Sequence, residues 1–368
     1  MGSVLADPHW SVMANERTIV IVGNGVAANV LGFYLRHEAQ TRGEARSSFQ
    51  TEPKIIQISH DRVYRPCSQS TTSHICLRNT RKGMSPLGDL LVEAFATFGA
   101  FFKRHAPSGV YACDHFHLWC RQSDWAAELF RRYEGVCFSG DKIDPFSGRF
   151  ARPYEMARNP AYVVDSTRYM DFLIDNARYD DVIDEGVVAV RKDSVKLASG
   201  REVSFDRLFL CTGQFTHAFS ETFQDPYHLN HSKPVAGTYL EFDLSDFRAK
   251  ELRDPMRAFC LDVEEVNLVF RPEDQTVLLG ATSRTDSDSY DHDTQIFEMY
   301  DKVQTYLAGT LTLPPRDRAR RVTGVRHKGH RRMPFWGEVA PRVYAIYGLY
   351  KNAFMTANLA AQELVRRL

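Results

Sequence analysis

The sequence predicts an α/β fold built on a Rossmann-like, mainly parallel β-sheet. Two observations predict this fold. Residues 18–22 are a short run of β-forming apolar residues that leads through a glycine-rich turn into an amphipathic helical pattern. After a polar insert over residues 38–53, a second apolar run over residues 54–61 has the length and composition of a buried strand. A strand, a helix and a second strand in this order begin a doubly wound sheet.

The turn after the first strand has the pattern Gly-x-Gly-x-x-Ala. Gly23 permits a tight turn, Gly25 lets the backbone approach a pyrophosphate, and Ala28 lets the helix pack closely on the strand. The free N–H groups and the positive end of the helix dipole favour an anion at the start of the helix. The turn therefore predicts a dinucleotide-binding site, and with it a redox enzyme.

The end of the second strand is where an acidic residue commonly binds the ribose hydroxyls of a dinucleotide. Here that position holds Ser59, and Asp61 follows two residues later. We therefore take Asp61 as the candidate for the ribose contact.

Composition limits the class of protein. The 368 residues are 43% hydrophobic, which suffices for one large domain or two interlocked domains. Lys and Arg (46) equal Asp and Glu (46), so net charge gives no reason to expect bulk attraction to nucleic acid or membranes. The sequence has no apolar run as long as a membrane span and no secretory signal, which predicts a cytoplasmic protein. Residues 1–16 are expected to form a flexible tail.

The cysteines do not predict a disulfide framework, because seven of them occur without a Cys-x-x-Cys pair. One cluster, which includes Cys113, His115, His117 and Cys120, contains possible metal ligands. Its spacing matches no structural zinc site, and the alternating histidines are more typical of one face of a strand. We therefore predict no metal site.

Further elements follow along the chain. Residues 85–104 have the spacing of an amphipathic helix behind a Ser-Pro start, and Asp165 is placed to cap a second helix. A run of short strands with glycine turns is expected next, over residues 186–190, 194–197, 202–205 and 207–210. A strand over residues 343–347 and a helix to the C-terminus close the chain.

The strand that ends at Thr212 and Gly213 resembles the second nucleotide-binding signature of FAD-binding proteins. Further segments resemble, in order, parts of the D-amino-acid-oxidase/glycine-oxidase family, so that the resemblance spans residues 18–368. They are residues 231–241, 268–282, 324–326, 334–337 and 343–348. The resemblance implies noncovalent FAD, since the final segment contains no cysteine of the kind that attaches FAD in some relatives.

The resemblance also implies the domain organisation. A discontinuous FAD-binding domain with a central parallel sheet is expected from residues 17–90, 160–230 and 325–368. An inserted α+β substrate domain with a mostly antiparallel sheet is expected from residues 91–159 and 231–324.

The cofactor contacts implied by the resemblance extend beyond the first turn. Ser68 belongs to a loop that wraps the cofactor in relatives, and its hydroxyl is a candidate partner for a phosphate. Val188, Thr212, Gly213 and Gly348 are the other residues that we expect at FAD.

Arg326 occupies the position at which family members hold the substrate carboxylate. A guanidinium offers two parallel N–H donors to a carboxylate and stays charged at any working pH. The turn after Gly348 is bulkier than in many members, because it contains Tyr350 and Lys351, which we take with Arg326 as the candidate catalytic residues. Lys351 either places a positive charge beside the flavin or contacts solvent.

The resulting hypothesis is an FAD-dependent oxidoreductase that oxidises the C–N bond of an amino acid or secondary amine. Residues 59–83 and 324–326 also resemble the oxidoreductase half of the bifunctional enzyme that modifies carboxymethylaminomethyl-uridine in tRNA, which implies a tRNA-modifying oxidoreductase as one alternative. Residues 316–332, with eight Lys or Arg and one acid, are a candidate phosphate-contacting surface for it. Two others are a flavin monooxygenase and a noncatalytic FAD-binding partner protein. The sequence predicts neither the amine nor the oligomeric state.

Overall fold

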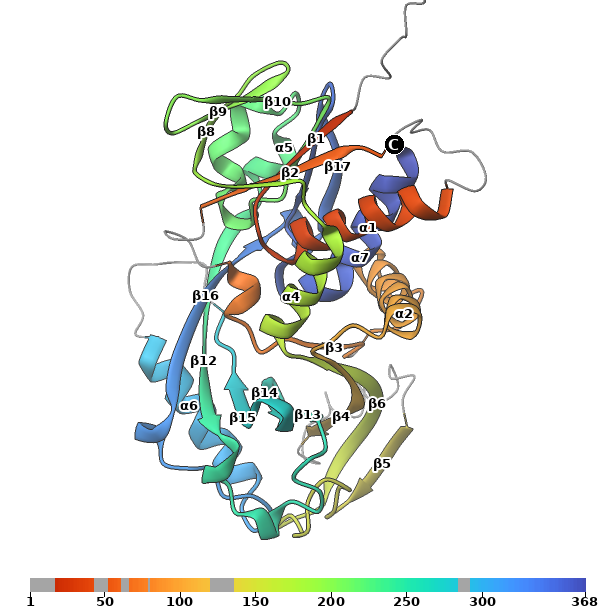
Figure 1. The fold of residues 1–368 in the computed structure, drawn as a ribbon. Coiled ribbons are helices and arrows are strands. Elements are labelled where there is room, and N and C mark those ends of the chain that lie inside the picture. Colours follow the sequence, from red (N-terminus) through yellow and green to blue (C-terminus); the bar gives the residue numbers. More distant parts are fainter. Residues whose placement is uncertain (1–16, 43–51, 61–65, 79, 120–135, 284–291) are drawn as a thin grey trace, which may run out of the picture.

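The computed structural model describes residues 17–42, 52–60, 66–78, 80–119, 136–283 and 292–368. The expected N-terminal tail and Asp61 therefore lie outside the described residues. The chain forms an upper part around a six-stranded sheet and a lower part around a nine-stranded sheet (Figure 1). The α/β class with one parallel and one mainly antiparallel sheet is thus confirmed.

The six-stranded sheet has the order β17-β18-β11-β1-β2-β7. Its strands are β17 (Phe335–Ala340), β18 (Val343–Tyr347), β11 (Arg207–Leu210), β1 (Thr18–Val22), β2 (Lys54–Ser59) and β7 (Asp181–Asp184). All neighbours are parallel except β17 and β18. The predicted strand order along the chain is confirmed, and strands more than 120 residues apart in sequence become neighbours.

The two faces of this sheet are covered differently, because alternate residues of each strand point to opposite sides. Ile19 and Ile21 of β1 pack with helices α1 (Val26–Arg42), α4 (Ser166–Ala177) and α7 (Ala353–Arg367). Val20 and Val22 pack on the opposite side. There the cover is a three-stranded sheet of β8 (Val187–Val190), β9 (Ser194–Leu197) and β10 (Glu202–Ser204), together with η2 (Gly213–Thr222) and the short α5 (Tyr227–Asn230).

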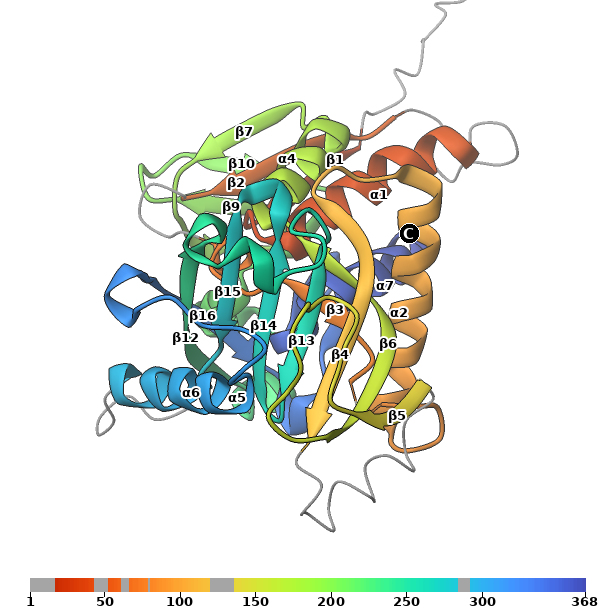
Figure 2. The same cartoon turned by 90° about the horizontal axis from the view of Figure 1, so that it is seen from below.

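The nine-stranded sheet has the order β16-β12-β15-β14-β13-β4-β6-β3, with β5 paired to β6. Its pairs are antiparallel except for β13 with β4. The bounds are β16 (Arg320–Lys328), β12 (Lys233–Asp243), β15 (Thr276–Gly280), β14 (Val266–Arg271), β13 (Phe259–Val263), β4 (Val110–Trp119), β6 (Tyr154–Val164), β3 (His74–Cys76) and β5 (Val136–Gly140). Figure 2 shows the sheet from below, with helix α6 (His292–Tyr306) beside it.

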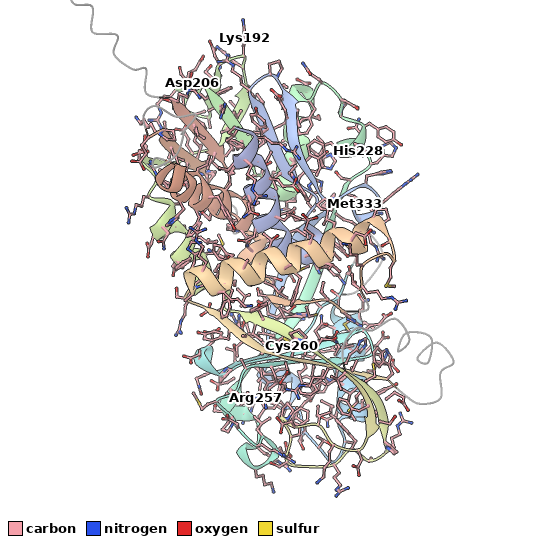
Figure 3. The ribbon with its side chains drawn as sticks, turned by 90° about the vertical axis from the view of Figure 1, so that its right-hand side faces the viewer. Lys192, Asp206, His228, Arg257, Cys260 and Met333 are labelled. Carbon is pink, nitrogen blue, oxygen red and sulfur yellow. The ribbon has the colours of Figure 1, made fainter. Side chains whose placement is uncertain are left out.

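The two predicted helix caps are confirmed. Ser85 precedes α2 (Pro86–His105), and its hydroxyl accepts a hydrogen bond from the Gly88 N–H. The Asp165 carboxylate accepts hydrogen bonds from Thr167 N–H and Arg168 N–H at the start of α4. Helix α2 crosses the molecule between the two parts (Figure 3).

Other features bear on the sequence expectations. The six described cysteines are free thiols. No helix in the described ranges is long and apolar enough to cross a membrane. The predicted domain boundaries stay a proposal, and strands β6 and β16, which extend across two of them, both belong to the nine-stranded sheet.

Candidate functional site

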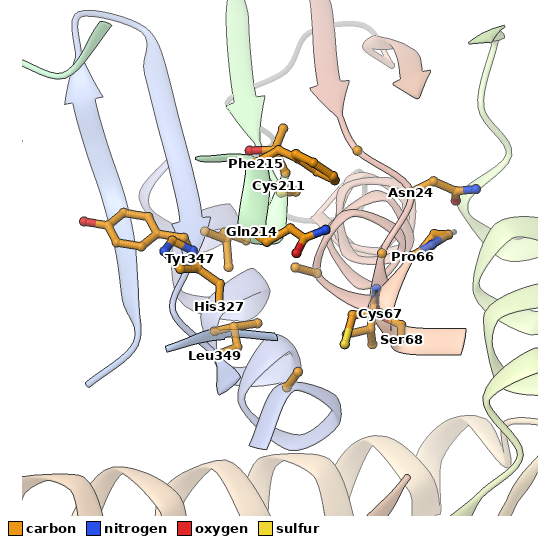
Figure 4. A pocket seen from close by; sticks show the side chains of 18 of the residues that line it. Asn24, Pro66, Cys67, Ser68, Cys211, Gln214, Phe215, His327, Tyr347 and Leu349 are labelled. Atoms are coloured by element: carbon orange, nitrogen blue, oxygen red, sulfur yellow. Dashed lines mark hydrogen bonds between the residues drawn. The ribbon is translucent and has the colours of Figure 1, made fainter. Parts of the chain in front are cut away.

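A cleft of about 400 Å³ extends from the carboxyl ends of the parallel strands to the edge of the nine-stranded sheet. Figure 4 shows Asn24, Cys67 and Ser68 on one side of it, Tyr347 and His327 on the other, and Gln214 between. The carboxyl ends of parallel strands are the usual ligand site in such sheets. The lining residues come from separated segments, which are residues 22–27, 58–60, 66–71, 185–187, 211–219, 325–327 and 346–354.

The turn between β1 and α1 forms one wall of the cleft. Gly23 has φ +122°, and a Cβ there would lie only 2.4 Å from the Cys211 carbonyl oxygen, so a side chain is excluded. At Gly25 the single protein atom near an added Cβ is Ser68 Oγ at 3.4 Å, which leaves room for a ligand. Ala28 is fully buried where α1 packs on the sheet.

A buried amide network holds this turn in place. Asn29 Nδ2 donates to Asn24 Oδ1 at 2.8 Å, and Gln57 Nε2 donates to Asn29 Oδ1 at 2.9 Å. The hydroxyl of Tyr179 donates to the same Asn29 oxygen at 2.9 Å. Sequence reasoning missed this network, because the partners are 28 and 150 residues away from Asn29.

Ser68 reaches the N-terminus of α1 from the loop after β2. Its Oγ accepts a hydrogen bond from the Val26 N–H at 2.9 Å. The hydroxyl therefore sits where the helix offers its first free N–H groups to an anion. Thus the structure brings the predicted Ser68 to the predicted glycines.

The turn after β11 and the turn after β18 also reach the cleft. Thr212 and Gly213 line it, and a Cβ added to Gly213 would meet no protein atom within 4 Å. Gly348 lines it with φ +74°, and a Cβ there would lie 2.8 Å from the Gly329 Cα. Gly348 is therefore required by close backbone packing, whereas Gly213 leaves open space for a ligand.

The far end of the cleft lies beside β2, β7 and β8. Ser59, His60, Glu185 and Val187 line it. Val188 does not, because its side chain is on the opposite side of the strand and 59% exposed. Ser59, which the sequence pattern places at the ribose position, is at the cleft.

Arg326 is at the other end, on strand β16. It lines the cleft, and its NH2 group donates a hydrogen bond to the Thr282 carbonyl oxygen at 2.8 Å. Its Cζ lies 5.6 Å from the centre of the Tyr350 ring. Lys351 Nζ lies 5.8 Å from the same ring centre, and the Tyr350 hydroxyl shares a hydrogen bond with Ser283. The three predicted catalytic residues are thus side by side.

Burial lowers the pKa of both cations, and neighbouring positive charge lowers that of Lys351 further. Burial lowers the pKa of Arg326, which still remains protonated at neutral pH. The pKa of Lys351 is lowered to about 8 by burial and then by the charges of Arg326, Arg78 and Arg332. Because Lys351 is also exposed to the cleft, its ammonium is available to an anionic ligand.

Sequence reasoning missed His327, Tyr347 and Cys67 as lining residues. His327 and Tyr347 stack with ring centres 5.6 Å apart, and His327 Nε2 is 2.7 Å from Ser232 Oγ. Burial lowers the pKa of His327 to about 4, so the ring is neutral at pH 7. The one available signal was that each of the three is a sequence neighbour of a predicted residue, namely Arg326, Gly348 and Ser68 respectively.

The histidine and cysteine cluster of the sequence lies away from the cleft. His115 and His117 are fully buried on one face of β4, as expected for alternating residues. Among the described residues no group of His, Cys, Asp or Glu is arranged to hold a metal ion. Cys120 lies outside the described residues.

At the start of the basic run over residues 316–332, the positive charges are largely neutralised by ion pairs with carboxylates. Arg316 pairs with Asp301, Arg318 with Asp246 and Arg320 with Glu241. These pairs remove part of the positive surface on which the nucleic-acid alternative depends.

With this geometry in place, comparisons with known proteins give a consistent result. The family described as FAD dependent oxidoreductase (DAO) matches residues 18–367. No curated protein matches the chain.

Solved structures share the fold at low identity. Glycine oxidase from Bacillus cereus is 14% identical with a TM-score of 0.71, and the match covers 96% of this chain and 94% of that one. Glycine oxidase from Geobacillus kaustophilus is 16% identical with a TM-score of 0.71 and 95% of both chains covered. Iminodiacetate oxidase from Chelativorans is 13% identical with a TM-score of 0.68 and 94% of both chains covered.

Proposed function

The chain belongs to the family of FAD-dependent oxidoreductases, and on that premise we propose that it oxidises the C–N bond of an amino acid or secondary amine. The enzyme class and the cofactor follow from the family. The bond that is oxidised, the carboxylate on the substrate and the residues that act on it are the proposal.

The cleft fits FAD in shape and in chemistry. Gly25 and Gly213 leave open space along it, and the N-terminus of α1 with Ser68 offers donors to a pyrophosphate. The adenosine would occupy the end with Ser59 and Val187, which puts the flavin at the end with Arg326 and Tyr350. When bound, FAD supplies the chemistry by accepting a hydride from the substrate Cα.

Arg326 carries the proposal for the substrate. Its guanidinium is held by the Thr282 carbonyl, and no carboxylate of the described residues pairs with it. A guanidinium fixed in this way offers its remaining donors to a substrate carboxylate, which orients the Cα–H bond. A half-buried arginine without a counter-charge among the described residues is costly, and an anionic ligand would offset that cost.

The reaction balances with these groups. The substrate loses a hydride from Cα and a proton from the amine, and an imine forms that water hydrolyses to a carbonyl compound and the free amine. Hydride transfer needs the neutral amine, because a protonated nitrogen has no lone pair to form the C=N bond. The protein's own part is to bind the carboxylate and to exclude water from the reacting carbon.

Anaerobic reduction of the bound flavin tests the proposal. Amino acids and secondary amines are added to the holoprotein without NAD(P)H, and the flavin absorbance is followed. Bleaching by an amine is expected, since the amine itself is the electron donor. Bleaching only by NAD(P)H would indicate the monooxygenase alternative, and no bleaching by either would indicate the noncatalytic one.

A further inference from the structure

The cleft has very uneven charge along its length. Glu185 is the one acidic residue that lines it among the described residues, and it is at the adenosine end. The opposite end contains Arg326 and Lys351, with Lys328 and Arg332 near them. The charge of the whole chain is zero, so this local excess is not a consequence of a basic composition.

Three of these cations surround one aromatic ring. Arg326 Cζ, Lys351 Nζ and Lys328 Nζ lie 5.6, 5.8 and 6.0 Å from the centre of the Tyr350 ring. Arg326 and Lys328 reach it from alternate positions of β16, and Lys351 reaches it from the turn before α7. Attraction to the ring face offsets only part of the repulsion between three like charges.

Among the described residues, no carboxylate is paired with these three cations. Within the described ranges, none forms an ion pair with Arg326, Lys328 or Lys351. Asp262 is buried nearby, but it pairs with Arg78, whose Nε lies 3.1 Å from its Oδ2. Glu265 raises the pKa of Lys351, but by less than burial or the charge of Arg326 lowers it. One substrate carboxylate at Arg326 would therefore leave the second cation of the cleft, Lys351, without a counter-charge.

From this excess we infer that the substrate carries two anionic groups, one bound by Arg326 and the other by Lys351 with Lys328 behind it. The inference rests on the proposed function and specifies its substrate class as an amino or imino dicarboxylate. If the first carboxylate neutralises one of the three cations and a negative charge on the cofactor neutralises another, the third cation still remains for the second anionic group of the substrate. The pKa of Lys351 is lowered first by burial and then by the neighbouring cations, and an anion beside the ammonium would act against both.

Two matched substrate pairs test the inference. N-methylglycine and N-(carboxymethyl)glycine differ by one carboxylate on the nitrogen side, and alanine and aspartate differ by one on the side chain. Both enantiomers of the second pair are used. Anaerobic flavin reduction gives kcat/KM for each, and we expect the dicarboxylate to exceed its partner by roughly 10- to 100-fold in one pair.

Variants connect that preference to Lys351. Lys351→Met should reduce the ratio of kcat/KM between dicarboxylate and monocarboxylate by roughly 10-fold or more, and Lys351→Arg should restore part of it. Lys192→Met removes an exposed lysine far from the cleft and should leave the ratio as it is (Figure 3). Flavin content measured on each sample separates loss of cofactor from loss of substrate recognition.

A binding measurement covers the case in which Lys351→Met does not fold. Succinate and butyrate cannot be oxidised at a C–N bond, and their binding is followed by perturbation of the flavin spectrum. Tighter binding of succinate to the wild-type protein, weakened by salt, supports the inference.

The results that contradict the dicarboxylate inference are distinct from those that contradict the proposed function. Equal or faster flavin reduction by the monocarboxylates in both pairs overturns the inference and leaves amine oxidation in place. An unchanged ratio of kcat/KM between dicarboxylate and monocarboxylate in Lys351→Met also overturns the inference. No flavin reduction by any amine overturns the proposed function itself.

Discussion

Arg326 shows how one side chain acquires its role from its surroundings. The sequence gives its position between a glycine turn and a basic run, but not its contacts. In the structure Gly237 on the paired strand β12 has no side chain, and a Cβ there would lie 1.5 Å from Arg326 NH2. The glycine therefore provides the space in which the guanidinium crosses the sheet to reach the Thr282 carbonyl.

Replacement of Arg326 by lysine keeps the charge and removes the paired donors. For a carboxylate substrate we expect Arg326→Lys to lower kcat/KM by ~10- to 100-fold, or roughly 1.4–2.7 kcal/mol of transition-state binding, with normal FAD content. Steady-state kinetics with Arg318→Lys as the matched control measure this, since Arg318 pairs with Asp246 outside the cleft. An unchanged kcat/KM would remove Arg326 from substrate binding.

A second prediction about a single residue concerns Gly25. Gly25→Val should abolish FAD retention, because its branched side chain would fill the space left for the pyrophosphate. Flavin absorbance per protein after gel filtration measures the loss. Gly140→Val is the control, since an added Cβ there meets nothing closer than 3.7 Å. Full retention of FAD in Gly25→Val would contradict the assignment of this turn.

The elements were more predictable than their contacts. Ser85 and Asp165 cap helices through neighbours in sequence, so local chemistry sufficed to find them. The loop from Cys67 to Gln69 shows the limit, because Ser68 meets α1 only through tertiary packing. Asn29, Gln57 and Tyr179 were missed for the same reason: each is an ordinary polar residue until the fold brings them together.

A buried ion pair joins three elements of the nine-stranded sheet. Asp262 on β13 is fully buried, 3.1 Å from Arg78 Nε in the segment after β3 and 3.0 Å from His115 Nε2 on β4. Burial would raise the pKa of Asp262, but the charge of Arg78 and the contact with His115 outweigh burial and hold the pKa well below its usual range. The carboxylate is therefore charged at every pH at which the protein is used.

Asp262→Asn should lower the free energy of unfolding by about 2–4 kcal/mol at pH 7, because Arg78 loses its buried counter-charge. Because the folded-state pKa is depressed, the stabilisation from this carboxylate is present above its unfolded pKa and is lost as pH falls through the folded-state value. Urea unfolding of both proteins at pH 7 and at pH 4 measures the difference, which should shrink toward acid. A difference that grows toward acid would contradict this assignment.

At the scale of the whole molecule, the site depends on both sheets. The parallel sheet supplies the nucleotide-binding turns, and β16 of the nine-stranded sheet brings Arg326 to the end of the same cleft. The order of motifs predicted this arrangement because Gly23, Thr212 and Gly348 follow strands that become neighbours. The cluster of cations around Tyr350, unpaired among the described residues, could not be predicted, since it depends on which acids pair elsewhere.

The arrangement also predicts how the cofactor is held. A cleft that encloses FAD through backbone donors and glycine contacts needs no covalent bond, so acid precipitation should release all of the flavin into the supernatant. Absorbance of supernatant and pellet measures the partition. Flavin that stays in the precipitated protein would show a covalent link, and Cys67 in the cleft would be the first residue to examine.

The orientation of FAD in the cleft is the central claim, and a crystal structure of the holoprotein with a bound dicarboxylate tests it most directly. We expect the pyrophosphate at the N-terminus of α1, the flavin ring at the end with Tyr350, and a carboxylate on the Arg326 guanidinium. A flavin ring at the end with Glu185, or a ligand carboxylate that makes no contact with Arg326, would contradict the account.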